Sequence, residues 1–223
     1  MTSTGNDIVS LATIDAARTK QYKFYSKIIS GAEKALYNEP GFEAIPFELF
    51  VWLLWSIKES AYKFLKRIDP ELIFTPVKFE VKQINIPPQF KLVDFALDEA
   101  EGTGFDDRLV LQGILSIGVN TLYSRSLLYN EAIITVVNDT DGFDDVFWGI
   151  KKISGSDNDI QSSEVRRILF DRLRRVMDLE ELTIIKNEKG VPVLLAGEKE
   201  MAIPVSLSHH DHMIAYSFQT GDR

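Results

Sequence analysis

The side chains best suited to chemistry lie in one short stretch of the chain, Trp55 to Lys63. Within it Glu59 and Lys63 are four residues apart, a spacing that puts both on one face of an α-helix. Lys58 would stand about 100° around the helix from Glu59, so it can flank the same pocket. A carboxylate beside two ammonium groups indicates a site for a metal cation and an anionic ligand. The alternative is an exposed Glu59–Lys63 ion pair, which contributes only about 0.3–0.5 kcal/mol.

A second carboxylate, that of Asp7, follows Gly5 and Asn6 and stands at the edge of an apolar segment. A hard cation such as Mg2+ needs only one or two protein carboxylates and takes its other ligands from water and phosphate. Asp7 and Glu59 together would meet that requirement. Asp7 can instead be a turn or helix-cap residue, which is a frequent role of aspartate.

The histidines of the chain stand close together near its end, at positions 209, 210 and 212. On a β-strand consecutive side chains point to opposite faces, so His210 and His212 would share one face and His209 the other. That arrangement disfavours a zinc site made of the three imidazoles. We therefore interpret His209, which directly follows Ser208, as the functional histidine of this segment.

The composition excludes several classes of protein. The 223 residues include no cysteine, which rules out disulfides, thiolate catalysis and cysteine-bound metal centres. The net charge of -8 argues against a general nucleic-acid binder, because such proteins need a basic surface. The N-terminus lacks a signal-peptide pattern, and the longest apolar stretch, Phe47 to Trp55, is too short to span a membrane. We expect a cytoplasmic protein without a membrane segment.

Basic residues nevertheless gather in three places. Each cluster could attract an anionic ligand or an acidic partner, or it could form the solvated side of an amphipathic helix. Two acidic stretches, 94–107 and 139–145, are interpreted as solvated loops. The basic clusters are Arg18, Lys20, Lys23, Lys27 and Lys34, then Lys58, Lys63, Lys66 and Arg67, and finally Arg166, Arg167, Arg172, Arg174 and Arg175.

Hydrophobic periodicity predicts an α+β fold. Apolar residues recur at helical intervals from Phe47 to Arg67, whereas residues 77–84 alternate apolar with polar as a half-buried antiparallel strand does. Ser162, Ser163 and Glu164 predict the start of a second long helix, 165–179. Each half of the chain is thus expected to hold a helix followed by antiparallel strands. The other expected elements are a short strand at 7–11, a helical segment at 14–36, and strands at 108–118, 132–138, 146–153, 182–195 and 205–218, with 119–131 undecided.

Four motifs in this order resemble those of the 4'-phosphopantetheinyl transferase superfamily. They are Gly5-Asn6-Asp7, the Lys-Glu-Ser block from Trp55 to Lys63, Gly190-Val191-Pro192 and Ser206-Leu207-Ser208-His209. The motif order is that of the short holo-acyl-carrier-protein synthase type, but the length is that of the type in which two halves are fused. The resemblance therefore implies a permuted two-half pseudo-dimer that is a monomer. Residues 1–150 would be the metal and Lys-Glu-Ser half, and residues 151–223 the coenzyme-binding half.

The resemblance implies an enzyme that transfers the phosphopantetheine arm of coenzyme A to a serine of an apo acyl or peptidyl carrier protein. Such an enzyme would serve fatty acid or polyketide biosynthesis and would need magnesium. The carriers of this family are acidic, so the basic run Arg18 to Lys34 would be their docking face. The implied roles are metal binding for Asp7 and Glu59, proton acceptance for Glu59 either directly or through a metal-bound water, phosphate binding for Lys58, Lys63, Ser208 and His209, and adenine-side contacts for Gly190 and Pro192. Charge and placement alone suggest Arg166 and Arg167 as contacts to the 3'-phosphate.

Three positions depart from the family pattern. Val9 stands where the longer type often has a third acidic ligand, and Ser10 where the shorter type usually has an acid. Val191 replaces the usual basic residue of Gly-x-Pro, which weakens a cationic contact to coenzyme A. Asp7, Glu59 and Lys63 are all retained, so we expect activity.

Two other functions compete with this interpretation. The chain could be a non-catalytic protein that binds coenzyme A or a carrier protein with the same fold. It could also be a magnesium-dependent phosphate-ester hydrolase that uses Asp7 and Glu59. The retention of Lys58, Glu59 and Lys63 together argues against the first. The lack of further clustered carboxylates or a two-metal motif argues against the second.

Overall fold

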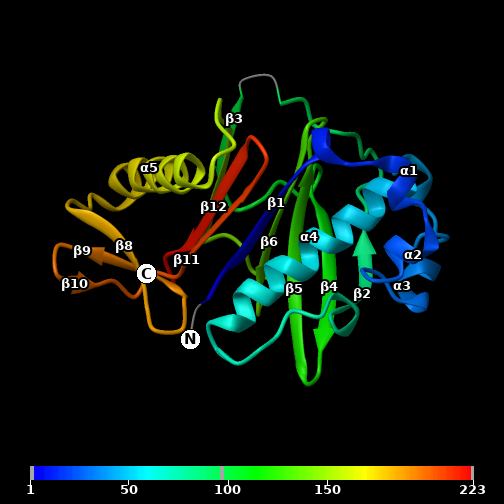
Figure 1. The fold of residues 1–223 in the computed structure, drawn as a ribbon, viewed down its shortest axis with the longest axis horizontal. Helices are drawn as coiled ribbons and strands as arrows, with labels where there is room; N and C mark the ends of the chain where they lie inside the picture. The colour runs from blue at the N-terminus through cyan, green and yellow to red at the C-terminus, as the bar shows by residue number, and fades with distance from the viewer. Residues whose placement is uncertain (1–2, 96–97, 222–223) are drawn as a thin grey trace.

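The computed structural model describes residues 3–95 and 98–221 of the chain. Two antiparallel sheets pack face to face, and each carries one long helix on its outer face (Figure 1). Helix α4 (Phe47–Lys66) covers the first sheet, and helix α5 (Asn158–Met177) covers the second. The predicted α+β fold, with a helix on an antiparallel sheet in each half, is confirmed.

The five-stranded sheet brings the start of the chain next to its middle. Its strands, in spatial order, are β1 (Gly5–Ser10), β6 (Ala132–Asn138), β5 (Asn120–Leu128), β4 (Leu111–Ile117) and β2 (Glu80–Asn85). Alternate residues of β1 enter different cores, since Ile8 faces the second sheet and Val9 faces α4. Strand β1 is therefore buried on both faces.

Helix α4 is the element that the sequence predicted best. It begins directly after Pro46 and ends at Lys66, within one residue of the expected Arg67. Its apolar stripe is almost fully buried against β1 and β6, as the 3.6-residue period requires. Because this stripe is buried, only the remaining residues of α4 can contribute side chains to a site.

The segment before α4 was predicted as one helical stretch, and that prediction was too simple. The structure has three short helices, α1 (Ala16–Thr19), α2 (Tyr22–Tyr25) and α3 (Gly31–Leu36). Asp15 caps α1 by accepting from the Arg18 N–H, and Ser30 and Glu33 form a capping box at α3. These capping contacts each begin a new short helix, so the segment does not form one continuous helix.

The four-stranded sheet contains one strand that the sequence did not predict. Its order is β11 (Val205–His210), β12 (Met213–Gln219), β7 (Val146–Lys152) and β3 (Glu99–Thr103). Strand β3 lies inside the acidic stretch 94–107 that was interpreted as a solvated loop. It is an edge strand whose glutamates are neutralised by Lys151, Arg172 and Arg175, partners that lie far away in the sequence.

Helix α5 begins earlier than expected. The predicted cap at Ser162 to Glu164 is wrong, because the helix starts at Asn158 and Asp157 caps it by accepting from the Asp159 N–H. The serines therefore lie within the helix. Beyond α5, a small sheet of β8 (Leu182–Lys186), β9 (Pro192–Ala196) and β10 (Lys199–Glu200) packs its apolar residues against the same core.

Strand β7 crosses residue 150, the predicted boundary between the halves. It pairs with β3 on one side and with β12 on the other. Strands from both sides of the boundary thus share one sheet, and the division into residues 1–150 and 151–223 stays a prediction. Among the described residues, no helix has the length and apolar character needed to cross a membrane.

Candidate active site

Asp7 and Glu59 meet at Lys63. The Lys63 ammonium donates to Asp7 Oδ1 at 3.0 Å and lies 3.4 Å from Glu59 Oε1. Asp7 comes from β1 and the other two residues from consecutive turns of α4, so the packing of strand on helix creates the cluster. The predicted convergence of two distant carboxylates is thus seen in the geometry, with a lysine between them.

Gly5 is the residue that allows β1 to come this close to α4. A Cβ at this position would lie 2.1 Å from the Ser60 carbonyl oxygen and 2.7 Å from the Phe64 nitrogen. Both atoms belong to the helix backbone and cannot move aside. The glycine of Gly-x-Asp therefore has a steric role, which is to bring Asp7 within reach of Lys63.

The Asp7 carboxylate is buried and incompletely paired. Burial raises its pKa to about 7, with a further increase from the charge of Glu59, while Lys63 opposes the shift. Its second oxygen, Oδ2, is buried and has no hydrogen-bond partner among the described residues. A carboxylate oxygen left unpaired in this way is suited to bind a cation or a proton.

Lys58 does not face the site, and its predicted contact with a phosphate is wrong. Its side chain is fully buried on the other side of α4, where its ammonium donates to Glu33 Oε2 at 2.7 Å and to the Ile28 carbonyl at 2.6 Å. Glu33 also accepts from the Val81 N–H at 2.8 Å. The rotation of about 100° between neighbouring helix positions was enough to bury Lys58 against α3 and β2.

Ser208 also has a structural role in place of the predicted one. Its hydroxyl accepts from Asn6 Nδ2 at 2.9 Å, and the Ser206 hydroxyl accepts from the Asn6 backbone N–H at 2.9 Å. Both serines and Asn6 are buried. The Ser-x-Ser motif thus fixes β11 against β1, one residue away from Asp7.

His209 lies beside Asp7 and Glu59, and its predicted contact to a phosphate stays a prediction. Together with Asp7, Glu59, Trp52 and Trp55, it lines a cavity of about 310 Å³. Burial lowers the pKa of His209, and the nearby charge of Lys63 lowers it further. The imidazole is therefore neutral at pH 7, and it stands beside the carboxylate cluster.

The other two histidines do not share a strand face as predicted. Strand β11 ends at His210, and Asp211 adopts a left-handed conformation (φ 55°) that turns the chain back into β12. His210 Nδ1 accepts from the Ser10 N–H at 3.1 Å, whereas His212 Nδ1 lies 3.1 Å from the Ile153 carbonyl. No group of three or more metal-ligating side chains occurs among residues 3–95 and 98–221.

A second cavity, of about 260 Å³, lies on the other side of Lys63. Gly190 lines it from the turn before β9, Pro192 from the first position of β9, and Ser206 from β11. Its basic lining residues are Lys63, Lys66, Arg67 and Lys189. The Gly-x-Pro motif, far from α4 in the sequence, is thus brought to the same cleft as the Lys-Glu-Ser helix.

Residues 3–99 match the family model of the 4'-phosphopantetheinyl transferase superfamily. The recognition made from the motifs is confirmed over this part of the chain. No curated protein and no solved structure matched the chain. The match includes Asp7, Glu59 and Lys63 and ends before the Gly-x-Pro and Ser-x-Ser-His motifs, whose roles stay predictions.

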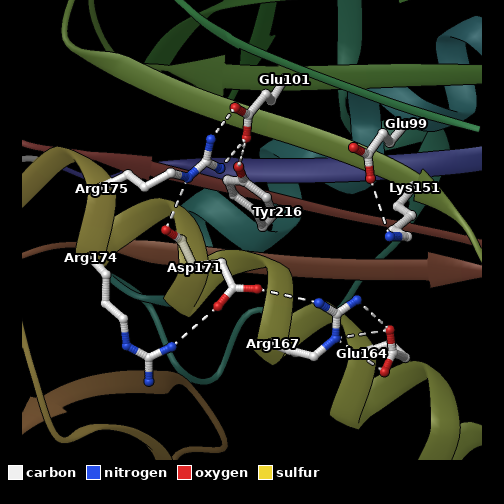
Figure 2. A network of polar contacts seen from close by, with 9 residues as sticks. All are labelled: Glu99, Glu101, Lys151, Glu164, Arg167, Asp171, Arg174, Arg175 and Tyr216. Carbon is white, nitrogen blue, oxygen red and sulfur yellow. Dashed lines mark hydrogen bonds and ion pairs between the residues drawn. The ribbon is translucent and has the colours of Figure 1, made fainter. Parts of the chain in front are cut away.

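Neither Arg166 nor Arg167 of α5 lines either of the two cavities. Arg167 pairs with Glu164 at 2.7 Å and with Asp171 at 3.2 Å (Figure 2). Its helix covers the second sheet, whereas the two cavities are lined by α4 and by β11. Arg167 is thus paired within α5, and a contact of Arg166 or Arg167 with the 3'-phosphate stays a prediction.

Sequence analysis missed several residues that build the site. Ser30-x-x-Glu33 is a capping-box pattern that could have been found, but nothing in it indicates that Glu33 also neutralises Lys58. Asn6 was seen only as the middle of Gly-x-Asp. Arg67 was seen only as part of a basic cluster and Lys189 was not singled out, because only the tertiary structure brings them to one cavity.

Proposed function

We propose that this protein transfers the phosphopantetheine arm of coenzyme A to a serine of an apo acyl or peptidyl carrier protein, in a magnesium-dependent reaction. The observation that carries the proposal is the Asp7–Lys63–Glu59 cluster between two cavities, one aromatic and one basic. The family match over residues 3–99 supports phosphopantetheinyl transfer in general.

Asp7 and Glu59 fit a magnesium ion as ligands. Asp7 Oδ2 is buried and has no hydrogen-bond partner in the described ranges 3–95 and 98–221, and Glu59 lies close enough to raise the Asp7 pKa. Two carboxylates are sufficient for Mg2+, which keeps several waters or phosphate oxygens as its other ligands. When bound, the metal supplies positive charge to a diphosphate.

Phosphate binding and proton acceptance would fall to side chains of the protein. Lys63, whose side chain is a quarter exposed, would donate to a phosphate oxygen from its place between the cavities. Glu59 would accept the proton of the attacking serine. The serine oxygen forms a bond to the phosphorus of the phosphopantetheine group, and the bond from that phosphorus to adenosine 3',5'-bisphosphate breaks.

The nucleotide end of coenzyme A would occupy the basic cavity, with Gly190 and Pro192 on its adenine side. The cavity of Trp52, Trp55 and His209 would then receive the arm and the acceptor serine. Lys63 lies between the two, where the bond to be broken would stand.

The basic run from Arg18 to Lys34 would dock the carrier. Its cationic residues are exposed on α1 to α3. Thr19 of α1 accepts from Trp52 Nε1 at 3.1 Å, so this face borders the aromatic cavity. An acidic carrier bound there would have its serine near Glu59.

The proposal is tested by incubating the protein with magnesium, coenzyme A and a purified apo acyl carrier protein and measuring the mass of the carrier. Wild type should add one phosphopantetheine group, and Glu59→Ala should not. Glu164→Ala is a matched control, because Glu164 pairs with Arg167 on α5 as Glu59 pairs with Lys63 on α4. It should leave transfer unchanged.

Other outcomes would favour the competing functions. Coenzyme A binding without any change of carrier mass would indicate the binding protein, and release of free phosphate would indicate the hydrolase. We also propose that the protein is a cytoplasmic monomer. A light-scattering mass of three subunits would contradict the monomer.

A further inference from the structure

A third cavity lies between α5 and strands β3 and β7, apart from the cluster at Lys63. Its volume is about 490 Å³, compared with about 310 Å³ and 260 Å³ for the two cavities beside Lys63. None of its lining residues lines either of those two. Small-molecule sites span about 300–1,000 Å³, so this cavity is large enough for a ligand of its own.

The cavity carries equal numbers of acidic and basic side chains, and they stand on different walls. The wall formed by β3 bears only carboxylates, whereas β7 and α5 together bear an excess of positive charge that balances them. A neutral lining with separated charges favours a ligand that has no net charge but carries a cation and an anion. The charged lining residues are Glu99 and Glu101 on β3, Lys151 on β7, and Arg167, Asp171 and Arg175 on α5.

One end of the cavity is closed by contacts to Glu101. This carboxylate accepts from Arg175 at 2.7 Å and from Arg172 at 3.0 Å, which ties α5 to β3. The Tyr216 hydroxyl donates to the same group at 3.4 Å (Figure 2). Tyr216 can lie there because Gly149 has no side chain, since a Cβ at Gly149 would stand 2.5 Å from the Tyr216 ring. The two walls are thus held together at this end.

The other end is open. Among residues 3–95 and 98–221, no hydrogen bond or ion pair joins Arg167 to Lys151 or to Glu99. Arg167 bonds to Glu164 and Asp171 of its own helix, and Lys151 donates to Glu99 of the neighbouring strand at 3.1 Å (Figure 2). The Glu164 hydrogen bonds raise the pKa of Arg167, and the charge of Glu99 raises it further, so the two walls face each other within electrostatic range.

The side chains at the open end keep hydrogen-bonding capacity for a ligand. The bonds of Arg167 use three of the five N–H groups of a guanidinium. The ammonium of Lys151 has three N–H groups and uses one of them, and Glu99 accepts through Oε2 alone in the described part of the chain. A carboxylate and an ammonium from a ligand can therefore join these groups without breaking an existing pair.

The spacing of the open-end groups limits the kind of zwitterion that fits. Lys151 Nζ and Glu99 Oε2 are 3.1 Å apart, so a ligand that bonds to both must carry its anion and its cation close together. An α-amino acid carries both on one carbon. Apolar lining residues continue inward from these groups, and they are Ala100, Gly149, Ile150 and Ile168.

We propose that this cavity binds a free α-amino acid with an apolar side chain. Its carboxylate accepts from Arg167 and Lys151, its ammonium donates to Glu99, and its side chain lies toward Ala100 and Ile168. The ligand adds one charge of each sign and leaves the lining neutral, whereas a singly charged ligand would leave one charge without a partner. The inference does not depend on the proposed transfer reaction, because the two sites share no lining residue.

The test is calorimetric titration of the whole protein with L-leucine and with two of its analogues at one fixed ionic strength. N-acetyl-L-leucine keeps the carboxylate but has no ammonium, and L-leucinamide keeps the ammonium but has no carboxylate. L-leucine should bind at millimolar concentration. Each analogue should bind at least about tenfold more weakly, the effect of one lost charge-assisted hydrogen bond.

Two variants with matched controls locate the binding. Arg167→Gln should weaken L-leucine binding by at least about tenfold. Arg174→Gln is its control, because Arg174 also lies on α5 and also pairs with Asp171 at 3.2 Å but does not line the cavity (Figure 2). This control should keep the wild-type affinity.

Glu99→Gln should weaken L-leucine binding by about two- to fivefold, as expected for an exposed charge. Its control is Glu131→Gln, because Glu131 pairs with Lys152 of β7 as Glu99 pairs with the adjacent Lys151, and Glu131 does not line the cavity. Glu131→Gln should leave the affinity unchanged.

The inference is overturned if L-leucine does not bind at millimolar concentration. It is also overturned if either analogue binds as tightly as L-leucine, which would indicate a site for a simple ion, or if folded Arg167→Gln and Glu99→Gln keep the wild-type affinity. Thermal melts show whether the variants are folded, and if they are not, the comparison of L-leucine with its analogues on wild type decides. Failure of carrier modification with L-leucine binding intact would reject the proposed function alone.

Discussion

Asp7 shows how a single residue can serve a site at the expense of stability. Its carboxylate is buried, its pKa is raised to about 7 by that burial, and one of its oxygens has no partner in the described part of the chain. A fold selected only for stability would have no reason to keep an ionisable group there.

We expect Asp7→Asn to lower the rate of phosphopantetheine transfer by at least about a hundredfold, because a charged ligand of the proposed magnesium ion is lost. The same change should leave the thermal midpoint at pH 7 unchanged or raise it, because a neutral amide is less costly to bury. Carrier mass and circular dichroism melts measure the two effects. A large loss of both activity and stability would show that Asp7 is a structural residue.

His210 makes stability depend on pH. Its Nδ1 accepts from the Ser10 N–H, and burial lowers its pKa below the ordinary value of 6.5, against the opposing charges of Asp211 and Glu59. The unfolded chain therefore binds more protons than the native protein below pH 6.5. The stabilisation is complete above that pH and is lost as the pH falls through the native pKa.

Urea unfolding between pH 7.5 and 5 checks this expectation. The free energy of unfolding of wild type should fall more steeply below pH 6.5 than that of His210→Asn, whose amide oxygen can still accept from Ser10 but cannot be protonated in this range. Equal slopes in the two proteins would remove His210 as the cause.

At the scale of elements, the Lys58–Glu33 pair joins three of them. Glu33 lies on α3, Lys58 on α4, and Glu33 also accepts from the backbone of β2. The pair is fully buried, so each charge depends on the other. It fixes the small helices of the proposed docking face against the helix that carries Glu59.

Removing one member of this pair should destabilise the folded protein. Lys58→Met should lower the free energy of unfolding by about 3–5 kcal/mol, because Glu33 is left as a buried charge without a partner. The double variant Lys58→Met with Glu33→Gln should recover part of that loss, since the glutamine can still accept from Val81. Urea denaturation of both proteins measures the difference, and additive losses would contradict the expected coupling.

Elements with strong local patterns were predictable, and those made by distant partners were not. Helix α4 has an uninterrupted apolar stripe between Pro46 and its end, so its period alone identified it. Strand β3 has the sequence of an acidic loop, because its glutamates are balanced by α5 and β7. The division of this segment into α1, α2 and α3 depends on individual capping residues, which the hydrophobic period of the whole segment does not reveal.

At the scale of the whole molecule, β1 connects the two sheets. Its residues pair with β6 and pack on β11, where Asn6 bonds to Ser206 and Ser208. Thr4 Oγ1 also lies 3.0 Å from Ser217 Oγ of β12. The start of the chain is thus buried against its end.

The chain should therefore unfold as one unit. Fragments 1–150 and 151–223 should each fail to fold alone, because the first would leave β3 and most of β7 without β12, and the second would leave β12 without β7 and β11 without the packing of β1. Heteronuclear NMR spectra of the separate fragments, and of their mixture, provide the measurement. Well-dispersed spectra of either fragment alone would show that the predicted halves are independent domains.

The sequence by itself determined the helix that carries Glu59 and Lys63, the α+β class and the resemblance to a family whose model matches residues 3–99, because these depend on local periodicity and on residues in fixed motifs. The tertiary structure decided which motif residues face the cleft. Lys58 and Ser208 turned out to be buried supports, while Arg67 and Lys189 came together from separate segments. A motif fixes the spacing of side chains along the chain, but only the packing of a helix or strand against its neighbours decides which of them meet a ligand.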